Sequence, residues 1–180
     1  MRTRVSPQEW VAAPREGDGV AGDPAMAPAA TVGLDPVDAP ALVLDTNAVL
    51  DWLWFADRSM HGVARAIVAG RCHWLQTGAM RAELEHVLRH RLPPRPGGDA
   101  GAVVTACRRW AHAVAEAAPA LLRCADRDDQ MFVDLAIAAG ARWLVTRDRA
   151  LLALARRAQA LGLAVIEPPH WPRSTSPRAA

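Results

Sequence analysis

Short apolar runs alternate with helix-like patterns of apolar residues along the middle of the chain. The runs that predict strands are residues 41–44, 72–76, 121–122, 142–146 and 163–166. Each run is too short for a helix, and between these runs apolar residues recur three and four positions apart. Strands that alternate with helices in this way predict an α/β domain with a mainly parallel sheet and helices on both of its faces.

The helical stretches are recognised by their apolar stripes. These stripes are Val63, Ala64, Ile67 and Val68; Met80, Leu84, Val87 and Leu88; Val103, Ala106, Trp110, Ala113 and Val114; Phe132, Leu135, Ala136 and Ala139; and Leu151, Leu154, Ala155 and Ala158. Thr77 and Asp126 stand where an N-cap residue is expected. Gly70, Gly140 and Gly162 stand where a helix is expected to end. The predicted helices therefore fall between the predicted strands.

The two ends of the chain lack this periodicity. Residues 1–39 are rich in Pro, Ala and Gly, and residues 172–180 read PRSTSPRAA. Segments of this composition do not bury a core, so both ends are expected to be disordered tails. A single domain at residues 41–171 is left, and it contains a Pro- and Gly-rich loop at residues 92–101.

Composition narrows the class of protein. About half of the 180 residues are apolar, which allows a core, and the net charge of +2 neither demands nor forbids a nucleic-acid partner. No apolar run is long enough to span a membrane and the first residues have no secretory pattern, so we expect a cytoplasmic protein. All basic residues are arginine. This excludes P-loop and Schiff-base chemistry, and it disfavours dehalogenase-type phosphatases and receiver domains, because all of these use a lysine.

The cysteines and histidines give no sign of a zinc site. Cys72, Cys107 and Cys124 are scattered and have no CxxC spacing. The histidines show no ligand spacing with an acidic partner. Free, mostly buried thiols and structural or exposed histidines are the expected roles.

Acidic residues follow two of the predicted strands. Asp45 comes directly after the first strand and Asp148 comes just after the strand at residues 142–146. An aspartate at such a place is by itself a common turn or cap residue. Open parallel sheets, however, place their functional sites beyond the carboxyl ends of the strands, so the pair points to a site there.

Helix geometry separates two glutamates. Glu85 has Arg81 four residues before it and Arg89 four residues after it, which predicts a solvated ion-pair face. Glu83 lies beside the apolar stripe, where a carboxylate is costly unless a metal ion or an arginine compensates it.

Three more aspartates cluster before the stripe that begins at Phe132. Asp126 can cap the helix, while periodicity places Asp128 and Asp129 on opposite flanks of the stripe and does not choose between them. Asp134 is expected on the surface. Carboxylates gathered without Cys or His favour Mg²⁺ or Mn²⁺ over zinc.

Four segments together resemble the PIN-domain ribonucleases. They are LDTNAVL at 44–50, AELEHVL at 82–88, DRDDQMFVDLAIAAGA at 126–141 and LVTRD at 144–148. The resemblance covers about 130 residues and is closest to toxin components of toxin–antitoxin systems. It implies a three-layer α/β/α sandwich with a mainly parallel sheet, RNA as substrate and Mg²⁺ or Mn²⁺ as cofactor.

The resemblance also implies a set of catalytic, metal-binding residues. These are Asp45, Glu83, Asp129 and Asp148, with Thr46, Asn47, Asp126 and Thr146 in support. Asp129 is chosen here because it stands eleven residues before Gly140, a spacing similar to the family's. No acid of the motif is missing, so an active enzyme is implied. One or two cations would activate water and neutralise the scissile phosphate.

Several partners and alternatives follow from these patterns. The toxin-like branch implies a small antitoxin that covers the acidic site. Arg127 and Arg147 are each as consistent with a phosphate contact as with an ordinary surface position. Trp52, Trp54 and Phe55 are expected in the core or at a homodimer face. The rival hypotheses are a PIN nuclease of RNA processing or structured DNA, a metal-dependent small-molecule phosphatase, and a non-catalytic binding module.

Overall fold

The computed structural model describes residues 39–92 and 98–172. Nearly all of the two predicted tails, and part of the predicted loop at residues 92–101, lie outside the described residues. The described part contains a parallel five-stranded sheet in the order β3-β2-β1-β4-β5. Its strands are β1 (Ala41–Leu44), β2 (His73–Gln76), β3 (Ala111–Ala113), β4 (Trp143–Val145) and β5 (Ala164–Ile166). The predicted α/β class with a parallel sheet is therefore confirmed.

The helices lie between the strands in the chain. They are α2 (Thr46–Leu53), α3 (His61–Val68), α4 (Gly78–His90), α5 (Ala100–Trp110), α6 (Gln130–Ala138), α7 (Arg149–Leu152) and α8 (Ala155–Gln159). Two 3-10 turns complete the set, η1 (Arg58–Met60) and η2 (Pro168–His170). Among the described residues, no helix is both long and apolar enough to cross a membrane.

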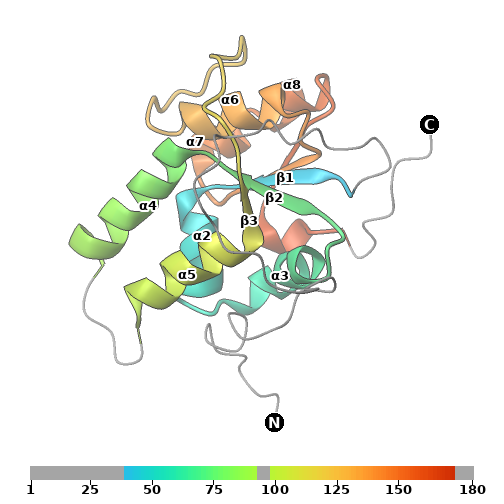
Figure 1. The fold of residues 1–180 in the computed structure, drawn as a ribbon. Helices are drawn as coiled ribbons and strands as arrows, with labels where there is room; N and C mark the ends of the chain where they lie inside the picture. Colours follow the sequence, from blue (N-terminus) through green and yellow to red (C-terminus); the bar gives the residue numbers. More distant parts are fainter. Residues whose placement is uncertain (1–38, 93–97, 173–180) are drawn as a thin grey trace, which may run out of the picture.

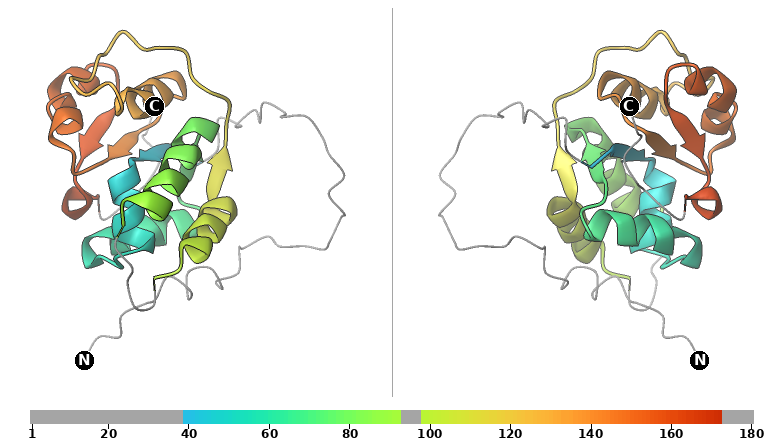
Figure 2. Two further views of the ribbon diagram at one scale, coloured as in Figure 1. Left: turned by 90° about the vertical axis from the view of Figure 1, so that its left-hand side faces the viewer. Right: turned by 90° about the vertical axis from the view of Figure 1, so that its right-hand side faces the viewer.

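The sheet is the middle layer of a three-layer sandwich (Figure 1). Helices α2, α3 and α5 cover one face, and α6, α7 and α8 cover the other, as the two side views also show (Figure 2). Alternate residues of β1 serve the two layers: Leu42 and Leu44 belong to one core cluster, and Val43 belongs to the other. Because β1 is buried on both faces, its sequence is a continuous apolar run instead of an alternating one.

Helix α4 connects the two layers at one end of the sheet. Leu84 and Leu88 pack into the cluster of α2, α3 and α5, whereas Met80 packs into the cluster of α6 to α8. Its N-cap is Thr77, whose hydroxyl accepts a hydrogen bond from the Met80 amide at 3.3 Å, as predicted. Helix α4 also contacts α2, which follows β1, and α6, which precedes β4. It therefore flanks the ends of these two strands.

The third strand was predicted in the wrong place. Residues 121–122 form a bend, and the third strand is β3, within the stretch predicted as the end of a helix. Helix α5 ends at Trp110, and Ala111 adopts extended backbone angles of φ −87° and ψ 138°. Backbone pairing with β2, where His112 lies opposite Leu75, therefore outweighs the helical preference of the alanines.

Three further helical regions differ from the prediction. Helix α6 begins at Gln130 and not at Asp126, whose carboxylate accepts a hydrogen bond from the Asp128 amide at 2.9 Å in the preceding loop. The helix predicted from Leu151 to Ala158 is divided into α7 and α8. Helix α2 was not predicted, because its buried residues form an almost continuous run and no distinct stripe.

Candidate active site

The order of the strands places a crevice between β1 and β4. From β1 the chain moves outward to β2 and β3, and it then returns to the other side of β1 to form β4 and β5. The carboxyl ends of β1 and β4 therefore lie side by side while their connections run in opposite directions. Such a switch point is where open α/β sheets place their ligands. Asp45 follows β1 at this edge, and Thr146, Arg147 and Asp148 follow β4.

Asp45 is fixed at the bottom of this edge. It is the N-cap of α2 and only 2% exposed, and its Oδ1 accepts a hydrogen bond from the Ala48 amide at 2.5 Å. Its Oδ2 accepts a hydrogen bond from the hydroxyl of Thr146. Burial raises the pKa of Asp45 to about 6, and these two hydrogen bonds only partly oppose the rise. The negative charges of Asp51 and Asp148 raise it further.

Thr146 joins the two strand ends. Its buried hydroxyl donates to Asp45 and accepts a hydrogen bond from the Asp148 amide at 2.8 Å. Asp148 in turn caps α7, because its Oδ1 accepts hydrogen bonds from the amides of Ala150 at 2.6 Å and Leu151 at 3.2 Å. The hydroxyl therefore sets the positions of both aspartates at once.

Asp129 completes the acidic group from the start of α6. Its pKa is raised to about 7, and partial burial is the largest cause. The negative charges of Asp148, Asp126 and Asp45 raise the pKa further. A hydrogen bond with Asp148 favours the protonated form as well. The charge of Asp148 thus acts on both Asp45 and Asp129, and the charges of Asp45 and Asp126 act on Asp129 as well.

Glu83 lies on the other side of the start of α2. Its Oε2 accepts a hydrogen bond from the Thr46 hydroxyl at 3.3 Å. Partial burial raises its pKa, and the charge of Asp128 adds to the rise. The charges of Asp45 and Asp148 act on Asp129, whereas the charge of Asp128 acts on Glu83. The choice of Asp129 over Asp128 stays a prediction.

The remaining predicted residues take varied positions. Asn47 is exposed in the first turn of α2. Glu85 forms an exposed ion pair with Arg89 at 4.0 Å, while Arg81 donates to Gln76 instead of Glu85.

The other outcomes concern Asp134, the cysteines and the aromatic residues near α2. Asp134, which was expected on the surface, is half-buried and accepts hydrogen bonds from the Ala120 amide and from Gln130. The three cysteines are free, with Cys72 and Cys107 buried. Trp52 and Trp54 are in the core, whereas Phe55 is 44% exposed.

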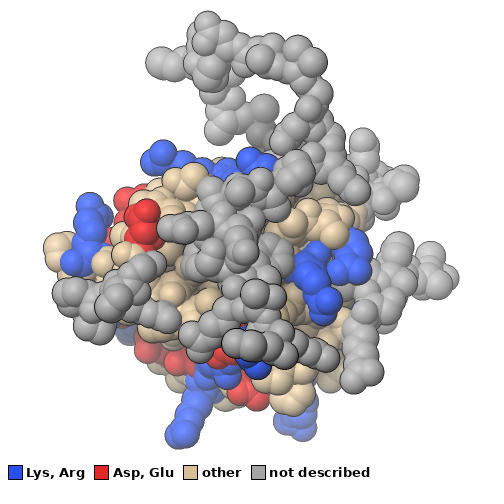
Figure 3. Space-filling view, turned by 90° about the horizontal axis from the view of Figure 1, so that it is seen from below, with Lys and Arg blue, Asp and Glu red and all other residues tan. Residues whose placement is uncertain are grey.

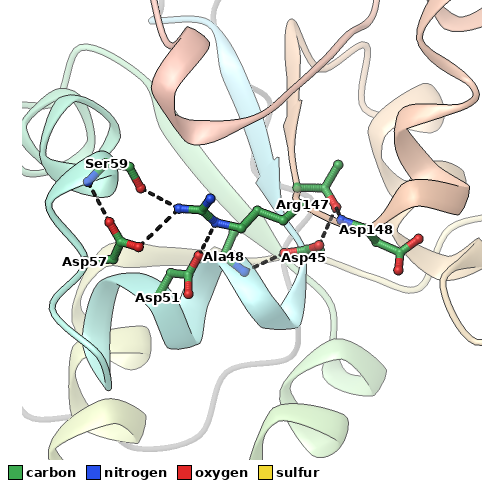
Figure 4. A network of polar contacts seen from close by, with 8 residues as sticks. Asp45, Ala48, Asp51, Asp57, Ser59, Arg147 and Asp148 are labelled. Carbon is green, nitrogen blue, oxygen red and sulfur yellow. Dashed lines mark hydrogen bonds and ion pairs between the residues drawn. The ribbon is translucent and has the colours of Figure 1, made fainter.

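A network around Arg147 borders the site, and no sequence pattern predicted it (Figure 4). Arg147 Nε donates to Asp51 at 2.6 Å, and its terminal nitrogen donates to Asp57 at 3.1 Å and to Ser59 at 2.7 Å. Asp57 also caps η1 through the Ser59 amide at 2.8 Å. Arg147 therefore fastens the loop between β4 and α7 to α2 and η1, and its guanidinium contacts carboxylates in this structure.

The donor set fits a hard divalent cation in its chemistry. It consists of carboxylates with threonine hydroxyls beside them, which are the ligands that Mg²⁺ and Mn²⁺ prefer. Burial, and secondly the charges of neighbouring acids, raise the pKa values of Asp45 and Asp129, so these carboxylates lie in a partly dehydrated and acidic environment. Within residues 39–92 and 98–172, however, no three such side chains already converge on one point. Each oxygen of Asp45 accepts one hydrogen bond, from the Ala48 amide or the Thr146 hydroxyl, which leaves further lone pairs for a cation.

Comparison with known proteins supplies one family. A family model described as "PIN domain" matches residues 41–150, a span that includes β1 to β4 and every acid of the group. A search of curated proteins found no significant match.

Proposed function

We propose that this chain, which belongs to the PIN-domain family, is an endoribonuclease that depends on Mg²⁺ or Mn²⁺. PIN domains are generally nucleases and generally use divalent metal ions. The observation that carries the proposal is the position of Asp45 and Asp148 at the switch point of the sheet, where the Thr146 hydroxyl joins them and where their charges act on Asp129. Acids held this close are costly to the fold, and a bound cation would offset that cost.

Each acid has a distinct part in the proposal. Asp45, Asp129 and Asp148 would hold the cation, and Glu83 would complete the set from α4. Thr46 and Thr146 orient Glu83 and Asp45 through their hydroxyl groups. Asp126 and Asn47 support the loop before α6 and the first turn of α2. When bound, the cation supplies a Lewis acid that activates water and neutralises charge on the scissile phosphate.

The protein's own contribution is to fix these groups before RNA arrives. The Ala48 amide and the Thr146 hydroxyl prevent rotation of Asp45, and the α7 amides prevent rotation of Asp148. Asp129 makes no cap hydrogen bond at the start of α6, and its carboxyl group pairs with that of Asp148. Acids that are already positioned suit the stabilisation of a charge that develops as the phosphate reacts.

The test is cleavage of RNA by the purified chain. Total RNA is incubated with the protein and Mn²⁺, with and without a chelator, and the new ends are mapped. We expect cleavage with Mn²⁺, none with the chelator, and none with Asp129→Asn. Glu85→Gln is the matched control, since it removes a charge from the same surface but only from an exposed ion pair. Cleavage that survives both the chelator and Asp129→Asn would refute the proposal.

We further infer a toxin role, which rests on the sequence resemblance alone. An acidic crevice accepts an arginine as readily as a cation, because carboxylates take bidentate guanidinium contacts. A small antitoxin could therefore inhibit the enzyme by occupying it. Expression of the chain alone should arrest growth, and co-expression of a small neighbouring gene should relieve the arrest. A chain that cleaves RNA but is harmless when expressed would indicate an RNA-processing nuclease instead.

A further inference from the structure

A cavity of about 700 Å³ lies apart from the acidic group, between α3 and the segment that follows β5. Ser59, Arg65 and Arg71 line one side of it, and Pro169 and Trp171 line the other. This volume is in the range of cavities that enclose a small organic ligand or part of a polymer. The nuclease chemistry proposed above uses none of the residues that form it.

The cavity has an excess of positive charge. Arg65 and Arg71 are exposed, and no carboxylate is among the residues that line the cavity in the described part of the chain. Arg65 is held by a hydrogen bond from its Nε to the carbonyl of His61 at 3.3 Å, which orients its guanidinium group. The face seen from below has several separate groups of arginine side chains (Figure 3). Two guanidinium groups at one cavity form a site for an anion such as a phosphate.

The opposite wall is flat, aromatic and rigid. The ring of Trp171 packs against Trp143 with 4.8 Å between ring centroids. It also lies so close to α3 that a Cβ atom on Gly62 would be 3.0 Å from its Cδ1. The absence of a side chain at Gly62 thus lets the indole lie against the helix. An indole fixed in this way can stack on any nucleic-acid base.

The cavity is connected to the acidic edge through the Arg147 network. Ser59 lines the cavity and accepts a hydrogen bond from Arg147, which directly precedes Asp148 (Figure 4). Turns η1 and η2, which border the cavity, also pack against each other. A strand of RNA that leaves the acidic edge across Arg147 would therefore enter this cavity.

We propose that this cavity is a second contact site for single-stranded RNA, with a phosphate at Arg65 and Arg71 and a base against Trp171. The inference rests on the proposed function for the identity of the ligand. It predicts that long RNA binds more tightly than a short fragment that reaches only the acidic edge. Positive charge, an aromatic wall and proximity to the cleavage site together favour RNA over a protein partner.

The test measures binding and cleavage separately. Fluorescence anisotropy with a labelled single-stranded oligoribonucleotide, in chelator, is recorded for the full chain over a range of salt concentrations. The double variant Arg65→Ala/Arg71→Ala should reduce the slope of log affinity against log salt by about 0.7, the contribution of the one phosphate contact that the proposal places there. The control Arg156→Ala/Arg157→Ala removes two exposed arginines from α8, which lies in the other helical layer.

Trp171 supplies an independent arm. Trp171→Ala should weaken binding by about 5- to 150-fold, as expected for the loss of one base–aromatic stack, and Trp171→Phe should retain part of the affinity. Circular dichroism confirms that each variant is folded. The phenylalanine variant keeps an aromatic ring against Gly62, so it remains informative if the alanine variant unfolds.

The outcomes separate this proposal from the nuclease proposal. Loss of affinity and salt slope at Arg65 and Arg71 but not at Arg156 and Arg157 supports the site, even if Mn²⁺ induces no cleavage. Equal effects of the two double variants would overturn it. A change in oligomeric mass caused only by Arg65→Ala/Arg71→Ala would overturn it too, because the cavity would then be a contact between copies of the chain. Normal cleavage of long RNA by that variant, with unchanged KM, would refute the site and leave the nuclease intact.

Discussion

The buried carboxylate of Asp45 gives the sharpest prediction. Asp45→Asn removes one negative charge and almost no volume. The amide oxygen of asparagine can still accept the hydrogen bond from the Ala48 amide, so α2 keeps its cap. Asparagine can also pair with the hydroxyl of Thr146, which both donates and accepts. We therefore expect the fold to remain, the metal-free protein to become more stable at neutral pH, and RNA cleavage to be lost.

The magnitude follows from the pKa of Asp45. Burial raises it from an ordinary 3.8 to about 6, so the folded protein binds this proton more tightly than the unfolded chain does. The resulting stabilisation is complete below about pH 3.8 and is lost as the pH rises through about 6. At pH 8 the loss is about 3 kcal/mol, because a tenfold change in proton affinity is worth about 1.4 kcal/mol. Asparagine avoids this loss, and we expect a gain of about 1–3 kcal/mol.

The assay is chemical and thermal unfolding in chelator at pH 5 and pH 8. The substitution should stabilise the protein about half as much at pH 5 as at pH 8, because the loss builds up between the unfolded and the folded pKa, and it should raise Tm by about 3–5 °C for each kcal/mol. Asp99→Asn is the matched control. Asp99 also caps a helix, with its Oδ1 accepting a hydrogen bond from the amide three residues later at 3.1 Å, but its side chain is exposed. It should change neither stability nor its pH dependence.

Two results would contradict this reasoning. Asp45→Asn could destabilise the metal-free protein at pH 8 as much as at pH 5, which would mean that the hydrogen bonds matter more than the buried charge. The variant could also cleave RNA at the wild-type rate in Mn²⁺, which would remove Asp45 from the proposed metal-binding set. Unfolding and cleavage are measured on the same preparation, so an inactive variant that is misfolded is recognised.

Three further predictions concern the same edge of the sheet. Glu83→Gln should lower cleavage by at least about 10-fold, whereas Glu85→Gln should change stability by well under ~1 kcal/mol and leave cleavage normal; equal rates for the two variants would show that Glu83 is not part of the site. Arg147→Ala should destabilise the domain by about 1 kcal/mol in urea unfolding, since its ion pairs are partly exposed. Arg147→Lys should recover only part of that stability, because lysine lacks the planar guanidinium group. Full stability of the alanine variant would argue against a structural role for the network. Added Mn²⁺ should raise Tm more at pH 8 than at pH 5, because Asp45 and Asp129 carry protons at the lower pH, and a rise that is independent of pH would place the bound metal elsewhere.

Four of the five strands were predictable because their apolar side chains determine them. β1, β2 and β4 are mostly buried, the edge strand β5 has one buried residue, and all four contain apolar runs that are bounded by glycines or polar residues. The edge strand β3 was missed because it is held by backbone pairing with β2, and its sequence Ala111–Ala113 would equally well continue α5. Alternation of apolar residues carries no information about a strand that is fixed by its neighbour.

The site was predictable in part for a related reason. Asp45 and Asp148 follow strands, so the geometry of a parallel sheet alone brings them to one edge. Helical periodicity could not choose between Asp128 and Asp129, because α6 begins only at Gln130 and both residues precede its first turn. The partners of Arg147 lie about 90 residues or more earlier in the chain, and no local pattern links them to it.

The bridge from Thr146 to Asp45 also bears on when activity can arise during synthesis. The two residues are 101 positions apart, and they meet only after β4 has paired with β1. A growing chain that ends just before Trp143 already contains Asp45, Glu83 and Asp129, but it lacks both Thr146 and Asp148. On the proposed function, such a chain is inert. On that proposal, the site can assemble only after Asp148 has been synthesised.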